Sequence, residues 1–146
     1  MRITSRGEYG LRALLDLAQR YGKGPVISAD IAARQEIPEA YLNQLLIVLR
    51  KANLVRSLRG PNGGHLLALP PNHITLAEAV VALEGSISLT DGMDVPASSI
   101  EPPEAAVLCE VWGQVEDAIG QVLQSITLED LCQRKLARSQ RIMYYI

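Results

Sequence analysis

Apolar residues recur at steps of three or four along the first part of the chain, and this spacing predicts three helices. The first is expected over residues 8–22 and ends at Gly22, and the second over 28–37 with Ser28 as its N-cap. The third begins at Pro38, because proline fits the first turn of a helix. Only a few residues separate the second helix from the third. This short connection predicts a helix-turn-helix.

Two short apolar runs, "LVRSL" and "HLLAL", follow the third helix and are joined by "RGPNGG". Gly and Asn tolerate positive φ, so the joined runs predict a tight β-hairpin. A hairpin directly after a helix-turn-helix predicts a winged helix. Arg59 stands beside glycines at the tip and can project from it, and narrow minor grooves attract such an arginine. The alternative is an ordinary surface hairpin with a solvated charge.

The fold class predicted is mainly α with a small β-hairpin wing: a winged helix-turn-helix domain plus a long dimerisation helix. The DNA-binding domain is expected over residues 1–85. Its last element is a short helix that Thr75 caps and that ends at Gly85. A Ser-, Pro- and Asp-rich stretch over 86–103 predicts a flexible loop. The long helix is expected over 104–126, and a C-terminal helical tail, with a further cap at Thr127, over 127–146.

One face of the long helix is apolar while the rest of that helix is acidic. A single apolar face outside the winged domain needs a partner to cover it, which predicts a homodimer. The alternative is that the helix folds back onto its own domain. The residues predicted at the dimer interface are Leu108, Val111, Trp112, Val115, Ile119, Val122 and Ile126.

The net charge of −2 hides an uneven distribution of charge along the chain. Residues 1–65 carry a net +5 and residues 66–146 a net −7, and no Lys or Arg lies between Arg59 and Arg134. A basic front half can meet phosphates, although chance clustering on a solvated surface would look the same. No apolar run approaches the length of a membrane span and no signal peptide is recognisable, so a cytoplasmic protein is expected.

Three blocks, "MRITSRGEYGLRALLDLA", "YLNQLLIVLRKANLVRSLRGPNGGHLLA" and "SITLEDL", resemble the Rrf2 family of dimeric winged helix-turn-helix transcription regulators. The resemblance covers nearly the whole chain. It implies a recognition helix beginning near Pro38 in the major groove, a wing in the minor groove and phosphate contacts from the N-terminus. His65 stands where the family usually has tyrosine. The residues expected to bind double-stranded DNA are Arg2, Thr4, Ser5, Arg6, Ser28, Pro38, Glu39, Ala40, Tyr41, Asn43, Gln44, Arg50, Lys51, Arg56, Ser57, Arg59, Gly60, Gly63, Gly64 and His65.

Some family members hold an iron–sulfur cluster with three cysteines in the loop before the long helix. Here that loop contains no cysteine, and an alignment on Trp112 puts Ala106 at the third cysteine and Cys109 at the histidine of that pattern. We therefore expect no cofactor and interpret Cys109 as a buried apolar residue of the dimer helix. The alternative is an iron–sulfur or redox-sensing regulator that uses Cys109 and Glu8.

The segments "ALEGSISL" and "ITLEDL" and the ending "MYYI" resemble a cluster-free branch of the family that represses cysteine metabolism. That branch works with cysteine synthase, whose active site accepts a C-terminal Ile carboxylate. The resemblance implies a repressor whose tail docks on this partner through Tyr144, Tyr145 and Ile146. The alternative is that the tail packs on the dimer helix. An enzyme is not expected, because no acid pair, phosphate loop or metal motif is present; a pure protein-interaction module is the other alternative.

Overall fold

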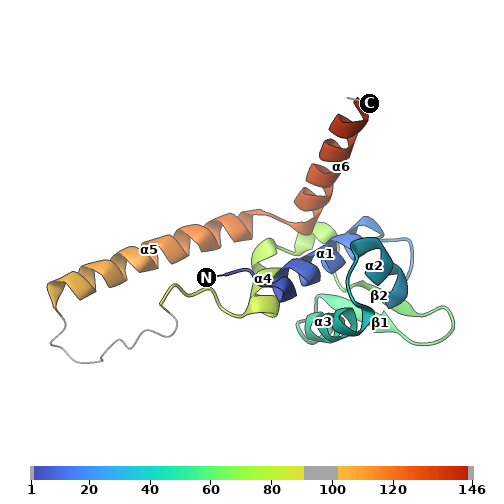
Figure 1. Cartoon of the computed structure of the whole chain (residues 1–146), viewed down its shortest axis with the longest axis horizontal. Coiled ribbons are helices and arrows are strands. Elements are labelled where there is room, and N and C mark those ends of the chain that lie inside the picture. Colours follow the sequence, from blue (N-terminus) through green and yellow to red (C-terminus); the bar gives the residue numbers. More distant parts are fainter. Residues whose placement is uncertain (1, 91–101, 145–146) are drawn as a thin grey trace.

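The structure is a computed structural model that describes residues 2–90 and 102–144 (Figure 1). Its elements follow in the order α1 (Ser5–Gln19), α2 (Ser28–Gln35), α3 (Glu39–Lys51), β1 (Val55–Leu58), β2 (Gly64–Leu67), a 3-10 turn (Pro71–His73), α4 (Leu76–Glu84), α5 (Pro103–Ser125) and α6 (Leu128–Tyr144). Six helices and one antiparallel hairpin confirm the predicted fold class, a winged helix with a long additional helix.

The core lies between α1, α2, α3 and α4. Leu14 and Leu17 of α1 pack there with Ile31 of α2 and with Leu42 and Leu49 of α3, and all five are almost fully buried. They recur at the helical steps seen in the sequence, since residues three or four apart share one face of a helix. The buried faces are therefore those that the pattern predicts. They hold α3 against α1 and α2.

The wing is a two-stranded antiparallel sheet in which Val55 pairs with Leu67 and Leu58 with Gly64. A third segment adds to its base: the N–H of Val26 donates to the carbonyl of His65 (2.8 Å), and the N–H of His65 donates to the carbonyl of Val26 (2.7 Å). This bridge ties the hairpin to the chain just before α2. The wing is thus held against the helix-turn-helix at its base.

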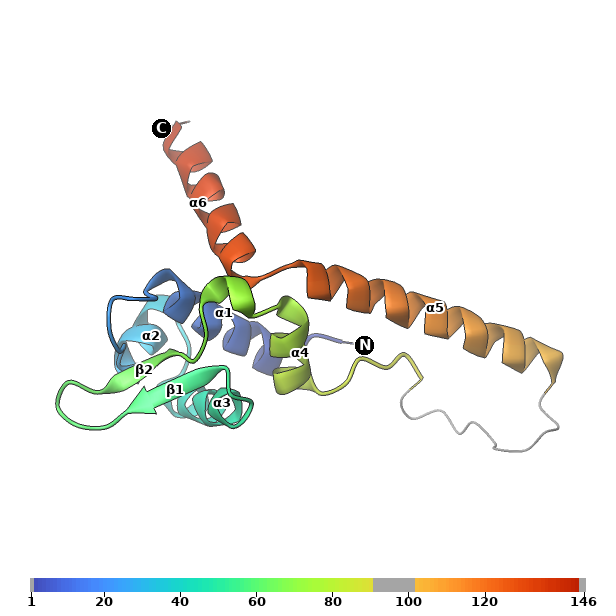
Figure 2. The same ribbon diagram turned by 180° about the vertical axis from the view of Figure 1, so that it is seen from behind.

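Helices α5 and α6 extend away from the remainder of the chain in different directions (Figure 1 and, from behind, Figure 2). The junction between α5 and α6 is fixed by backbone pairing. The N–H of Leu76 donates to the carbonyl of Ile126 (2.7 Å), and the N–H of Leu128 donates to the carbonyl of Ile74 (3.0 Å). Thr75 and Thr127 lie opposite each other in this bridge. Each caps its helix, accepting the N–H of Glu78 or Asp130, and the two predicted caps are confirmed.

Several details differ from the sequence-based expectations. Ser28 is the first residue of α2 and makes no cap; its hydroxyl donates instead to Glu39 at the start of α3 (3.4 Å). Ile126 is extended and lies just beyond α5, because its carbonyl pairs with α4. Leu128 and Cys132, at the start of the expected tail, are buried in the same core as α1. Their burial packs the N-terminal end of α6 against the winged domain.

Candidate nucleic-acid interface

Helix α3 presents two different faces. Its leucines are buried, whereas Glu39, Ala40, Asn43 and Gln44 are exposed on the opposite side. Asn and Gln side chains can bond an adenine edge through two hydrogen bonds, and an α-helix fits the width of the major groove. The outer face of α3 therefore has both the shape and the chemistry for reading bases.

Tyr41 lies between these two faces. Its ring packs edge-on against Tyr9 of α1, with 6.0 Å between the ring centroids and 79° between the planes. The guanidinium of Arg12 lies 4.9 Å from the centroid of Tyr9 on the same helix. Tyr41 is thus partly occupied in holding α3 against α1.

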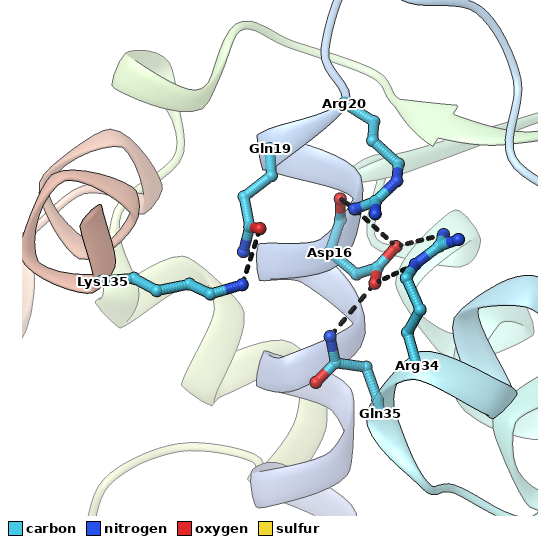
Figure 3. A network of polar contacts seen from close by, with 6 residues as sticks. All are labelled: Asp16, Gln19, Arg20, Arg34, Gln35 and Lys135. Carbon is cyan, nitrogen blue, oxygen red and sulfur yellow. Dashed lines mark hydrogen bonds and ion pairs between the residues drawn. The ribbon is translucent and has the colours of Figure 1, made fainter. Parts of the chain in front are cut away.

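A buried carboxylate holds α2 against α1 (Figure 3). Asp16, only 1% exposed, accepts two hydrogen bonds from Arg34 (2.9 and 3.0 Å) and one from Gln35 (3.1 Å), and Arg20 lies 3.4 Å away. Burial raises the pKa of Asp16, but the hydrogen bonds and charges of its partners outweigh burial and leave the pKa below its usual value of 3.8. Arg12 also donates to the carbonyl of Gln35.

This network was missed at the sequence level. The sequence nevertheless contains a sign of it, because Asp16 stands among the buried positions of α1, between Leu14 and Ala18 on the side that faces the core. A carboxylate at such a position needs charged partners, because an unpaired buried charge is costly. Arg34 and Arg20 were counted only as positive charge for DNA, whereas the structure uses them inside the helix-turn-helix.

The tip of the wing leaves Arg59 exposed next to Gly60. Backbone atoms lie so close to the two glycines after the turn that a side chain would not fit at either position. A Cβ on Gly63 would collide with the carbonyl of Leu58 across the turn, and a Cβ on Gly64 would lie 2.7 Å from the carbonyl oxygen of Val26. Both glycines therefore permit the close backbone approach that shapes the wing.

His65 lies at the base of the wing, half-buried, with its Nδ1 atom 2.8 Å from the hydroxyl of Ser57 on the opposite strand. Its backbone N–H is used by Val26. Ser57 and His65 thus form a cross-strand pair in the structure. Burial, and to a smaller extent the charge of Arg50, lowers the pKa of His65 from its usual value of 6.5.

We expect the wing to lose stability in mild acid. An imidazole whose pKa is lower when folded is protonated more readily in the unfolded chain, so its stabilising contribution is complete above pH 6.5 and falls as the pH drops through and below that value. Urea unfolding from about pH 7.5 to about pH 5.5 measures this dependence. The loss of unfolding free energy should be smaller in His65→Gln than in wild type; equal losses would contradict this role of His65.

The N-terminal segment leads into α1. Arg2, Ser5 and Arg6 are exposed, as phosphate contacts require. Thr4 is engaged within the chain, because its N–H and its hydroxyl both donate to a carboxylate oxygen of Glu84 (3.0 and 2.7 Å). Thr4 therefore fixes the start of α1.

The ten basic side chains in residues 1–65 divide into two groups. Three make contacts within the domain: Arg12, Arg20 and Arg34, of which Arg34 is also exposed. The other seven are exposed: Arg2, Arg6, Lys23, Arg50, Lys51, Arg56 and Arg59. They lie on the N-terminal segment, the end of α3 and the wing, together with Lys23 before α2. The candidate interface is thus a basic surface around the outer face of α3.

The apolar side of α5 is open to solvent in the single chain. No residue of α5 is buried, and Leu108, Val111, Trp112, Val115 and Val122 are between 37% and 58% exposed. Ile119 and Ile126 are half-buried instead. The helix therefore does not fold back over its whole length.

The candidate ligands of a cluster lie on different helices. Cys109 is exposed on α5 of the single chain, where a buried residue was expected, because nothing in this chain covers that side of the helix. Glu8 is exposed on α1, while Cys132 is buried in the core, and burial raises the pKa of its thiol. Within residues 2–90 and 102–144, no group of three His, Cys, Asp or Glu side chains is arranged to hold a metal ion.

The expected partner-binding tail falls at the edge of the described residues. Tyr144 is the last residue of α6, and Tyr145 and Ile146 lie outside the described part. Leu136, Ile142 and Met143 of α6 are 59–76% exposed. In the described residues, no helix is both long and apolar enough to cross a membrane.

Similarity to known proteins is extensive. Residues 3–134 match the Rrf2 family, described as "Iron-dependent Transcriptional regulator". The chain is 38% identical over 146 residues to the HTH-type transcriptional regulator CymR of Bacillus subtilis (strain 168), with both chains covered completely. It is 39% identical over 131 residues to the HTH-type transcriptional regulator IscR of Photorhabdus laumondii, covering 90% of this chain and 79% of that one.

Solved structures agree with these matches. The structure of CymR, the global cysteine regulator of B. subtilis, superposes with a TM-score of 0.76 at 38% identity, covering 92% of this chain and 98% of that chain. T. potens IscR superposes with a TM-score of 0.73 at 40% identity, covering 92% and 88%. These relatives are transcriptional regulators and not enzymes. The chain belongs to the Rrf2 family of transcriptional regulators.

Proposed function

We propose that this chain is a dimeric, sequence-specific DNA-binding repressor. The observation that carries the proposal is the exposed polar face of α3, flanked by exposed arginines and set on a buried leucine face. In this account Glu39, Asn43 and Gln44 contact base edges and Arg59 enters the minor groove. Arg2, Arg6, Arg50 and Arg56 contact phosphates and fix the register. Thr4 and Ser57 support these contacts through Glu84 and His65.

Dimerisation is supported by the exposed apolar side of α5. Five large apolar side chains on one side of a 23-residue helix form a surface that soluble monomers rarely leave open. A symmetric pair of such helices would cover both copies of this surface. A dimer would also present two recognition helices to two half-sites about one helical turn, or a multiple of it, apart.

The regulator is proposed to work without a cluster. Iron–sulfur clusters are held mainly by several thiolates, and of the two cysteines one is exposed on α5 and the other is buried in the core. The relative that matches over the complete chain is named CymR, and a solved CymR is called the global cysteine regulator of its organism. A stoichiometric cluster in protein purified without oxygen would contradict this and favour the alternative with Cys109 and Glu8.

Arg59→Ala should weaken binding to a specific duplex by about 1–3 kcal/mol, because it removes a groove contact. The duplex is first selected by the wild-type protein from a random-sequence library, and Kd is then measured by fluorescence anisotropy. Lys23→Ala, which removes an exposed charge from the loop between α1 and α2, is the matched control. Equal losses for both variants would show that Arg59 contributes only charge. Failure of the library to yield any bound sequence would favour the protein-interaction module.

The C-terminal tail is proposed to dock on cysteine synthase. One support is the resemblance of the ending to that branch of the family. The other is that Ile142 and Met143 are exposed, so that apolar side chains are accessible close to the C-terminus. A terminal carboxylate and an apolar side chain suit a pocket that captures chain ends.

Deletion of Ile146 should therefore abolish binding to purified cysteine synthase, because the carboxylate moves and its side chain is lost. Isothermal titration calorimetry measures this. The DNA affinity of the same variant, measured alone, should stay unchanged. Binding of cysteine synthase that survives the deletion would contradict docking through the tail.

A further inference from the structure

The N-terminus of α1 is capped by a side chain from a distant helix. Thr4 occupies the N-cap position but makes no side-chain cap. Glu84, the last residue of α4, accepts the N–H of Thr4 (3.0 Å), the hydroxyl of Thr4 (2.7 Å) and the N–H of Gly7 (2.8 Å). These two N–H groups are the ones that a capping box satisfies from within its own helix. Here one carboxylate from α4 satisfies both.

The fit of this contact depends on two glycines of α1. A Cβ on Gly7 would collide with the carboxylate of Glu84, and a Cβ on Gly10 would collide with the side chain of Leu83. The absence of side chains at both positions lets the end of α4 lie directly on the first turns of α1. The hydrogen bonds from Thr4 and Gly7 and the charge of Arg6 lower the pKa of Glu84, so the carboxylate is charged at neutral pH.

A second acidic side chain anchors the segment that follows. Glu116, midway along α5, accepts the backbone N–H of Leu89 (2.7 Å). Glu84 and Glu116 therefore hold the two ends of the segment 85–89, one on α1 and the other on α5. This segment is one link between the start of α1, which carries Ser5 and Arg6, and the long helix, in addition to the contacts that α4 makes with both helices.

We propose that Glu84 is a positioning residue for the phosphate contacts of the N-terminal segment, and that Glu116 makes this positioning depend on the placement of α5. The proposal rests on the DNA-binding function proposed above and deepens it. A change in the position of α5, such as a rearrangement of the dimer, would act on Leu89 and, through Glu84, on the first turn of α1. The first turn would then fray, and the backbone that carries Arg2 and Arg6 would no longer be held by the hydrogen bonds of Thr4 and Gly7 to Glu84.

Simple electrostatics predicts the opposite effect of Glu84 on DNA binding. A carboxylate next to Arg6 lies close to the proposed phosphate sites, so its removal should strengthen DNA binding if it acted only through its charge. The same holds if Glu84 blocked N–H groups that a phosphate could use. The positioning proposal requires that removal weakens binding. The sign of the change therefore separates these explanations.

The test measures Kd for the selected duplex over a series of salt concentrations with the full-length variants Glu84→Ala and Glu84→Gln. Removal of a helix cap, and of the phosphate binding that depends on it, should raise Kd by about three- to tenfold for Glu84→Ala. The dependence of log Kd on log salt should fall by about one ion for each phosphate that the variant no longer binds. Glu84→Gln, which preserves size and one acceptor, should show a smaller change. Glu110→Gln, an exposed charge-matched control on α5, should not raise Kd.

Amide hydrogen exchange tests the link to α5 without DNA. Glu116→Ala, which removes the acceptor of the Leu89 N–H, should accelerate exchange of the Leu89 amide and also of the Gly7 amide, whereas Glu110→Ala should change neither. Unchanged or tighter DNA binding by both Glu84 variants would overturn the positioning role, and acceleration confined to Leu89 would overturn the link. If wild type bound no DNA, the proposed function would fail and the phosphate role with it. The exchange of Gly7 would still show whether α5 controls the start of α1.

Discussion

Replacement of Val115 by aspartate should convert the proposed dimer into monomers. Val115 lies in the exposed apolar side of α5, and the replacement acts in both copies of a symmetric interface. Each copy loses an apolar side chain worth about 1.5–3 kcal/mol and would bury an unpaired carboxylate. The dimer dissociation constant should rise at least about a hundredfold. Sedimentation velocity over a range of protein concentrations measures it.

DNA binding should fall with dimerisation. A monomer reaches one half-site only and loses the high effective concentration of the second domain, so affinity for the selected duplex should decrease by about 10²–10⁴. Gln121→Asp, an exposed position away from the apolar side of the same helix, is the control and should remain a dimer. A Val115→Asp variant that stays dimeric would show that another surface forms the interface.

Removal of the buried carboxylate of Asp16 should give the second large effect. Asp16→Ala leaves Arg34 and Gln35 without their acceptor at the junction of α1 and α2. Loss of one partner of a buried ion pair typically costs about 3–5 kcal/mol. Arg34 retains 34% exposure of its side chain and can be partly solvated, so we expect a decrease of about 2–4 kcal/mol in the free energy of unfolding. Chemical denaturation measures it.

Two comparisons make this result specific to the buried pair. Asp117→Ala, which removes an exposed aspartate from α5, should change the stability by about 0.5 kcal/mol or less. Since the pKa of Asp16 is lowered on folding, its contribution is complete above the unfolded value of 3.8 and is lost as the pH falls through the folded value. Wild type should therefore lose more stability than Asp16→Asn in this acidic range. Parallel acid profiles would contradict the role of the network.

Much of the fold could be predicted from periodicity and turn residues. The buried positions Leu14, Ile31 and Leu42 follow helical steps, and the glycines around Pro61 mark the hairpin. The caps Thr75 and Thr127 were recognisable because a carboxylate stands three residues after each. These features depend on short stretches of sequence, which explains why they could be read from the chain alone.

The rest depends on contacts between segments far apart in the sequence. Glu84 caps α1 although it lies 77 residues after Gly7 in the sequence, and the residues around Glu84 and Gly7 contain no pattern that predicts this contact. Asp16 with Arg34 joins two helices in the same way. The exposed outer face of α3 was predictable, because it is the complement of a leucine pattern. Which exposed arginines are free for DNA was not predictable, because it depends on which ones the fold uses internally.

The salt dependence of DNA affinity tests the central claim most directly. Kd of the wild-type dimer is measured for the selected duplex and for a scrambled one from about 50 to about 200 mM salt. Seven exposed basic side chains of residues 1–65 lie outside the contacts of Arg12, Arg20 and Arg34, mostly around the outer face of α3, so counterion release should make the affinity fall steeply with salt. The selected duplex should bind about 10³-fold or more tightly than the scrambled one throughout. Affinity that is insensitive to salt, or equal for both duplexes, would contradict a sequence-specific DNA-binding regulator.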